Sequence, residues 1–198
     1  MKDGDRFTPS QRAGLENCRT MEQLLAMTHH YMNGTCPFCG DSAEYDTPWL
    51  PISGVHWRVK ENRWPMAHTK KHLIIAPVVH ITELSQVEAL AWAEMGPILA
   101  RIKERYGKIY GGLAFRSGSL AYSAGTVEHL HANILYPDLT GPVRVTLAKE
   151  VSGPELERRH RRFHGFKDAL PPDEYLFLSN HGIGLSSLLV NEIHDSSE

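Results

Sequence analysis

The sequence lacks any long apolar run. No hydrophobic stretch of the kind that directs secretion lies near its N-terminus, and no run of about 20 apolar residues occurs anywhere. Internal repeats and low-complexity segments are absent as well. We therefore expect a cytoplasmic protein without a membrane-spanning segment, and 198 residues suffice for one well-buried core with some additional elements.

The chain has almost no excess of either charge. Its 21 Lys and Arg residues nearly balance 23 Asp and Glu residues, which leaves a formal net charge of −2. Such a balance exerts no long-range attraction on nucleic acid or anionic lipid. The basic run at residues 158–162 offers a place for a polyphosphate or a nucleic acid, although a solvated helix face has the same composition. We therefore expect no nucleic-acid partner.

Cysteine is scarce. The three cysteines cannot all pair, and Cys36 and Cys39 form a Cys-Pro-Phe-Cys motif. In a reducing compartment this spacing indicates metal or redox chemistry before it indicates a structural disulfide. A thioredoxin-like redox centre remains an alternative, but no helix opens directly after the motif as it does in that fold. Cys18, within a predicted helix, is interpreted as an ordinary thiol.

Periodicity divides the rest of the chain into helices and strands. Helical patterns occupy residues 10–32, 83–106 and 155–167. Extended patterns occupy residues 56–60, 71–77, 111–115, 126–136 and 143–148. A Ser- and Gly-rich loop is predicted at residues 116–126, where the backbone could approach a ligand closely.

The segment Glu-His-Leu-His-Ala-Asn-Ile-Leu places polar side chains on alternate residues. Because side chains alternate across a strand, His129, His131 and Asn133 should share one face, with the apolar residues between them on the other. A surface strand would show the same alternation, so the pattern alone leaves that interpretation open.

Four residues together predict a metal site. Cys36 and Cys39 have the spacing of a zinc half-site, His80 follows the strand at residues 71–77, and His129 opens the later polar face. Cys2His2 coordination would close a tetrahedron. Because four protein ligands leave no open position, the zinc would be structural.

The motifs resemble, in this order, those of the histidine-triad superfamily, whose signature is His-φ-His-φ-His-φ-φ, where φ is apolar. The resemblance covers residues 36–137 and rests on the following segments: the cysteine motif, Asn-Arg-Trp-Pro at residues 62–65, the run from His72 to His80, the long helix, the Ser/Gly loop and the motif around His131. It implies an α+β fold, in which a long helix packs on an antiparallel sheet of about five strands, and a homodimer.

The resemblance also implies a division of the chain. Residues 1–35 would form an N-terminal helical extension, residues 36–137 the histidine-triad-like core with its zinc knuckle, and residues 138–198 a C-terminal extension packed on the core.

By the same resemblance, His129 would be the fourth zinc ligand and His131 the nucleophile that attacks the α-phosphorus of a nucleotide. Imidazole suits this step because it is largely unprotonated near neutral pH and forms a reactive phosphoramidate. Water or a phosphate-bearing acceptor would then resolve the nucleotidyl-histidine.

Further residues acquire expected roles from the family. Ser123 and Thr126 would contact phosphate oxygens together with backbone N–H groups, Asn62 would hold the ribose, and His72 would support the active-site network. Each also has a plain structural explanation: turn residues for Ser123 and Thr126, a turn cap for Asn62, and a buried histidine for His72.

Three positions depart from the family pattern. Asn133 replaces the third His or the Gln of the signature, and Gly125 stands where many members have a phosphate-contacting Gln. Ala114 or Arg116 stands near a usual Asn, and Arg116 could contact a phosphate or an acidic group directly. Since an Asn cannot act as an acid, these departures favour transfer or phosphorolysis, or reduced activity.

The sequence therefore predicts a nucleotide hydrolase or nucleotidyltransferase that cleaves a phosphoanhydride or phosphoramidate through His131. A catalytically weak nucleotide-binding or regulatory protein of the same fold is the alternative. A zinc-dependent nucleic-acid-binding module is a third hypothesis, and the net charge argues against it.

Overall fold

The computed structural model describes residues 8–40 and 47–148, which form two compact units. The first unit contains residues 8–35, 120–128 and 147–148, and the second contains residues 36–40, 47–119 and 129–146. The helix predicted at residues 155–167, the basic run within it and most of the predicted C-terminal extension lie outside the described residues.

The first unit is helical. Helix α1 (Pro9–Glu16) begins at a Thr8 capping box, and helix α2 (Met21–Met32) begins at Thr20, whose hydroxyl accepts from the Gln23 N–H. The prediction of one or two short helices over residues 10–32 is confirmed. A single-turn helix α4 (Leu120–Ser123) packs against α1, inside the segment predicted to be a loop throughout.

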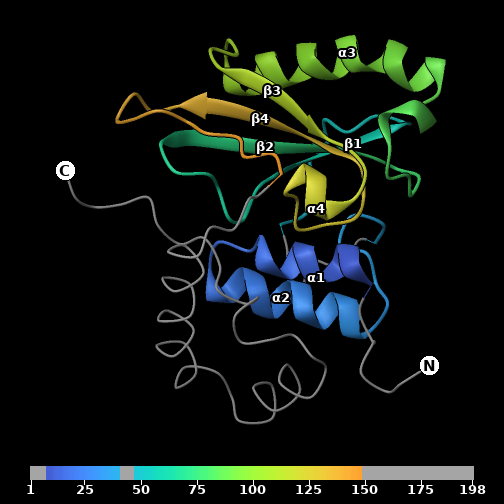
Figure 1. The fold of residues 1–198 in the computed structure, drawn as a ribbon. Helices are drawn as coiled ribbons and strands as arrows, with labels where there is room; N and C mark the ends of the chain where they lie inside the picture. The colour runs from blue at the N-terminus through green and yellow to red at the C-terminus, as the bar shows by residue number, and fades with distance from the viewer. Residues whose placement is uncertain (1–7, 41–46, 149–198) are drawn as a thin grey trace, which may run out of the picture. The chain divides into compact units, whose positions relative to one another are not determined.

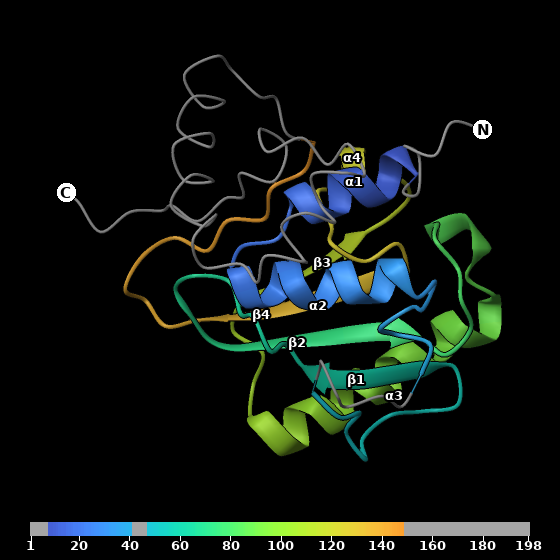
Figure 2. The ribbon, with the colours of Figure 1, turned by 90° about the horizontal axis from the view of Figure 1, so that it is seen from below.

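The second unit is built on a four-stranded antiparallel sheet. Its strands are β1 (Trp57–Glu61), β2 (Thr69–Pro77), β3 (Gly112–Arg116) and β4 (His131–Pro137). They lie in the order β1-β2-β4-β3, so β2 and β4 are central and the other two are edges (Figures 1 and 2). The α+β prediction is confirmed, with four strands in the described part of the chain.

Two strand predictions were wrong in part. Residues 143–147 have no strand partner, and β4 begins at His131 rather than at residue 126. Before His131, the Leu130 N–H donates to the carbonyl of Ile81, which lies in a connection and not in a strand. Alternating side chains therefore predicted the strand correctly from His131 onward, whereas the backbone bends at residues 126–129.

The long helix also starts later than predicted. Residues 84–86 form a separate 3-10 turn, and helix α3 (Ala89–Tyr106) follows it. The Gln86 side chain accepts from the N–H groups of Thr82 and Glu83, which closes that turn, and Val87 and Glu88 are extended. Gly107, with a φ of 83°, ends the helix.

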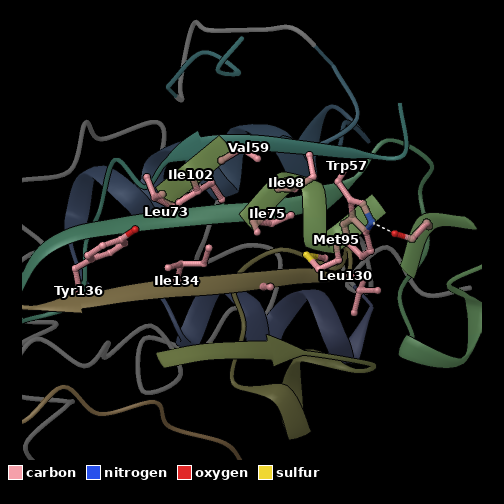
Figure 3. Close-up of a cluster of buried hydrophobic side chains, with 12 residues drawn as sticks. Trp57, Val59, Leu73, Ile75, Met95, Ile98, Ile102, Leu130, Ile134 and Tyr136 are labelled. Atoms are coloured by element: carbon pink, nitrogen blue, oxygen red, sulfur yellow. Dashed lines mark hydrogen bonds between the residues drawn. The ribbon is translucent and has the colours of Figure 1, made fainter. Parts of the chain in front are cut away.

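Helix α3 covers one face of the sheet and forms the core with it (Figure 3). The buried helix positions follow a spacing of three or four residues: Ala91, Met95, Ile98 and Ile102. They meet the apolar side chains of β1, β2 and β4, and the Trp57 indole N–H donates to the Ala91 carbonyl at 2.6 Å. The opposite face of the sheet carries the polar side chains of His72, His131 and Asn133.

None of the helices in the described part of the chain is both long and apolar enough to cross a bilayer.

Candidate metal centre and histidine site

The polar face of the sheet is defined by strand register. His131 lies opposite Arg116 on β3, and Asn133 lies opposite Ile74 on β2, two residues from His72. Directly opposed residues in an antiparallel pair share a face, and alternate residues do so as well. Arg116, His72, His131 and Asn133 therefore project from one face, and all four are buried.

The four residues predicted as zinc ligands lie together. The ligand atoms of Cys36, Cys39, His80 and His129 are all within 4.8 Å of one another. The Nδ1 atom of His129 is 3.4 Å from the Cys36 Sγ and 3.5 Å from the Cys39 Sγ. Zinc bonds of about 2.3 Å to sulfur and 2.0 Å to nitrogen place tetrahedral ligands about 3.5 Å apart. The spacing fits a small tetrahedral cation.

The surroundings of the cluster orient its ligands. The Nε2–H of His129 donates to the Pro77 carbonyl at 3.0 Å, which leaves its Nδ1 lone pair directed at the sulfurs. Burial lowers the pKa of His129 to about 4, so its imidazole is neutral. The Phe38 N–H lies 3.4 Å from the Cys36 Sγ, as a donor to a thiolate would.

The cysteines of this cluster favour a cation. Burial, with a smaller contribution from Cys39, raises the pKa of Cys36 to about 12. Without a positive ion the thiol would stay protonated, whereas a bound metal deprotonates a coordinating thiol. The donor set of two sulfurs and two imidazoles suits zinc, and the described residues could hold a metal ion here.

His131 presents one ring nitrogen for chemistry. Its Nδ1–H donates to the His129 carbonyl at 2.8 Å, so Nε2 carries the lone pair. Burial is the main cause that lowers the pKa of His131 to about 3, and the charge of Arg116 lowers it further. A neutral imidazole with an oriented Nε2 is the form required of a nucleophile.

Asn133 takes part in a hydrogen-bonded chain with His72. The Met66 N–H donates to the His72 Nδ1 at 3.1 Å, so His72 carries its proton on Nε2 and donates to the Asn133 Oδ1 at 2.9 Å. This assigns the orientation of the Asn133 amide, whose Nδ2 lies 3.4 Å from the Ala114 carbonyl. Asn133 can therefore offer a ligand its remaining N–H and the second lone pair of its Oδ1.

Asn62 forms a turn at the end of β1. Its Oδ1 accepts from the Trp64 N–H at 2.9 Å, and its Nδ2 lies 3.3 Å from each ring nitrogen of His72. The turn-capping explanation of Asn62 is therefore confirmed, and its expected ribose contact stays a prediction.

The sequence did not predict the aromatic residues beside the histidines. Phe38 is one of the two residues between the cysteines in the sequence. Its ring packs edge-on against the His131 ring, with the two ring centroids 5.3 Å apart. The buried Lys60 ammonium lies 4.4 Å from the centre of that ring and 4.6 Å from that of Trp49. The only signal for Phe38 was its place inside the cysteine motif.

Ser123 and Thr126 belong to the first unit, where the N-terminal helices hold their segment (Leu120–Glu128). The Asn17 Nδ2 donates to the carbonyls of Leu120 and Gly125 at 3.1 and 2.8 Å. The Tyr31 hydroxyl donates to the Thr126 carbonyl at 2.6 Å. A Cβ added to Gly14 would lie 2.6 Å from that hydroxyl and 2.5 Å from a Leu120 methyl, so a larger residue there would have to displace these side chains.

Replacing Asn17 with Ala should loosen Leu120–Glu128. Two buried carbonyls would lose their donor, which costs about 1–3 kcal/mol and should speed amide exchange in this segment at least about 5-fold. Hydrogen-exchange mass spectrometry measures this directly. Asn33→Ala is the matched control, because the Asn33 side chain bonds to His29 of α2 and not to this segment. Equal exchange rates in both variants would contradict the prediction.

Comparison with protein-family models and with curated proteins found no match. Solved structures with a similar fold include a "Hit Like Protein", which is 22% identical with a TM-score of 0.37, over 45% of this chain and 89% of that one. A HIT family hydrolase from Legionella pneumophila Philadelphia 1 is 20% identical with a TM-score of 0.39, over 61% and 99% of the two chains.

A third structure, a histidine triad nucleotide-binding protein from Candida albicans, is 16% identical with a TM-score of 0.43, over 69% of this chain and 100% of that one. These three structures carry the name of the family that the sequence resembles. At these identities the likeness concerns the fold alone.

Proposed function

We propose that this protein is a nucleotide hydrolase or nucleotidyltransferase that cleaves a phosphoanhydride or phosphoramidate through a nucleotidyl-histidine on His131. The observation that carries the proposal is the fixed tautomer of His131. Its Nδ1–H is bound to the His129 carbonyl, so a buried, neutral ring directs its Nε2 lone pair into the polar face. The histidine-triad resemblance supports the same role.

The reaction proceeds in two displacements. The Nε2 atom of His131 attacks the α-phosphorus, and the bond to the leaving group breaks. Water or a phosphate-bearing acceptor then attacks the same phosphorus, and the N–P bond breaks, which returns the lone pair to Nε2. The carbonyl of His129 keeps the imidazole in one orientation throughout.

Cys36, Cys39, His80 and His129 would hold one structural zinc. With all four positions taken by the protein, the ion has no open site and supplies stability rather than chemistry. It would tie the cysteine motif to the connection after β2 and to the residues before β4, and so fix the backbone carbonyl that orients His131.

The nucleotide would be held by neutral donors and by one guanidinium. The hydroxyls of Ser123 and Thr126 would contact phosphate oxygens, Arg116 a phosphate, and Asn62 the ribose. His72 would fix the amide orientation of the adjacent Asn133, whose remaining N–H could then reach the ligand. As the family resemblance implies, we also propose a homodimer.

One observation favours a second candidate, a nucleotide-binding or regulatory protein with little turnover. The Asn133 carbonyl oxygen is already bound to His72, and a carboxamide cannot protonate a leaving group. Substrates that need an acid at this position would then bind without reacting.

Intact-mass analysis separates the two candidates. The protein is mixed briefly with nucleoside diphosphates, triphosphates, dinucleoside polyphosphates or nucleoside phosphoramidates, and is unfolded in alkaline denaturant because N–P bonds are labile in acid. We expect one nucleotidyl group per chain, located at His131 by peptide mapping.

Calorimetry with the same compounds completes the experiment. Nucleotide binding without any adduct or product would favour the regulatory protein. An adduct on a different residue would refute the role of His131.

A further inference from the structure

Arg116 is placed beside the proposed nucleophile by the sheet itself. It is the last residue of β3 and the direct register partner of His131 on β4. The Cβ atoms of such partners are about 5 Å apart and point to the same face. Arg116 is also 92% buried, since its relative exposure is 8%. Its side chain is therefore buried on the same face of the sheet as the reacting imidazole.

The charged side chains that the described strands place on the polar face are all basic. Arg58 and Lys60 project from β1 at one edge, and Arg116 projects from β3 at the other. The described strands place no Asp or Glu on this face. A guanidinium stays charged at any physiological pH and binds phosphate through two parallel N–H groups. An anionic group that enters beside His131 would therefore meet basic strand residues and no strand carboxylate.

The two substrate classes of the proposed function differ in the charge of the leaving group. A phosphoramidate releases an amine, which carries no negative charge. A phosphoanhydride releases a phosphate, whose bridging oxygen gains negative charge as the bond breaks. A cation that stabilises this growing charge lowers the barrier for the second class and does little for the first.

We infer that Arg116 is a specificity-determining residue that selects substrates whose leaving group is itself a phosphate, so that phosphoanhydrides are cleaved in preference to phosphoramidates. The inference rests on the proposed function. In the step it controls, the Nε2 of His131 forms a bond to the α-phosphorus and the bond from that phosphorus to the bridging oxygen breaks. The electron pair stays on that oxygen, which leaves with the terminal phosphate beside Arg116.

The test compares two substrates with the same nucleoside, the 5′-diphosphate and the 5′-phosphoramidate, on wild-type protein, Arg116→Met and Arg116→Lys. We expect wild type to prefer the diphosphate. Arg116→Met should lose about 100-fold or more in kcat/KM on the diphosphate and less than about 5-fold on the phosphoramidate. Arg116→Lys keeps the charge but loses the bidentate contact. Its kcat/KM on the diphosphate should therefore lie between those of wild type and Arg116→Met.

Controls address folding. Arg105→Met changes an exposed arginine of α3 and should leave both activities unchanged. Thermal unfolding and zinc content report whether each Arg116 variant is folded, and the Lys variant provides the test if the Met variant is not. An equal loss on both substrates would overturn the inference, as would a wild-type preference for the phosphoramidate. A wild type that turns over neither compound and forms no adduct would overturn the proposed function, and this inference with it.

Discussion

His131→Ala is expected to abolish nucleotidyl-adduct formation and to reduce turnover by at least about 1000-fold, because the variant has no other imidazole with an oriented Nε2 at that place. Alanine removes the attacking nitrogen but leaves the backbone of β4 and the proposed zinc ligands in place. Steady-state turnover and the intact-mass experiment measure both effects on one preparation.

The informative comparison is with His129→Ala, two residues earlier. The Nδ1 of His129 faces the cysteine sulfurs, and its Nε2 is bound to the Pro77 carbonyl. We therefore expect this variant to lose zinc, whereas His131→Ala keeps it. His68→Gln, a change at a histidine bound to Thr140, should alter neither property. Full activity in His131→Ala would refute the proposed mechanism.

The second large effect is expected for Cys36→Ser. The variant should lose its zinc, from about one ion per chain to almost none, and become less stable by several kcal/mol. Metal binding in small zinc domains contributes on the order of 10 kcal/mol to folding, and a serine hydroxyl is a poor replacement for a thiolate. Elemental analysis and thermal unfolding, with and without a strong chelator, measure the two quantities.

Cys18→Ala is the control for this experiment. Cys18 is fully buried in the first unit, its Sγ donates to the Gly14 carbonyl, and it is not one of the four residues of the cluster. Its replacement should cost about 1 kcal/mol and leave the zinc content unchanged. A native protein that contains no zinc and a disulfide between Cys36 and Cys39 would support the redox interpretation instead.

Local patterns predicted most of the second unit. Side chains alternate with a period of two in β4, and Met95, Ile98 and Ile102 recur at helical spacing in α3. Each pattern arises from one element with one buried face, so it can be recognised in a short stretch of sequence. Boundaries were less predictable. The start of α3 depends on the Gln86 side chain, which closes a separate turn before the helix. Residues 143–147 have the composition of a strand, but no neighbouring strand pairs with them.

The metal donors could be predicted because their types are rare and their spacing is characteristic. Two cysteines three residues apart and two histidines at strand ends have few other uses together. In the structure the potential ligand atoms of these four residues all lie within 4.8 Å of one another. Their occupancy by zinc, like the roles of His131 and its neighbours, stays a prediction until the experiments above are done.

The sequence by itself determined which face of β4 is polar, where the core helix packs and which residues are available for metal and phosphorus chemistry, since these follow from side-chain alternation and residue type. Only the tertiary structure decided the pairing of Arg116 with His131, the orientation of Asn133 by His72 and the contact of Phe38 with His131. Each of these depends on the register between strands or on contacts between segments distant in the chain, and no short window of residues encodes them. The sequence left the role of Asn133 open. The structure shows that its Oδ1 is bound to His72 and that one of its N–H groups is directed at the Ala114 carbonyl.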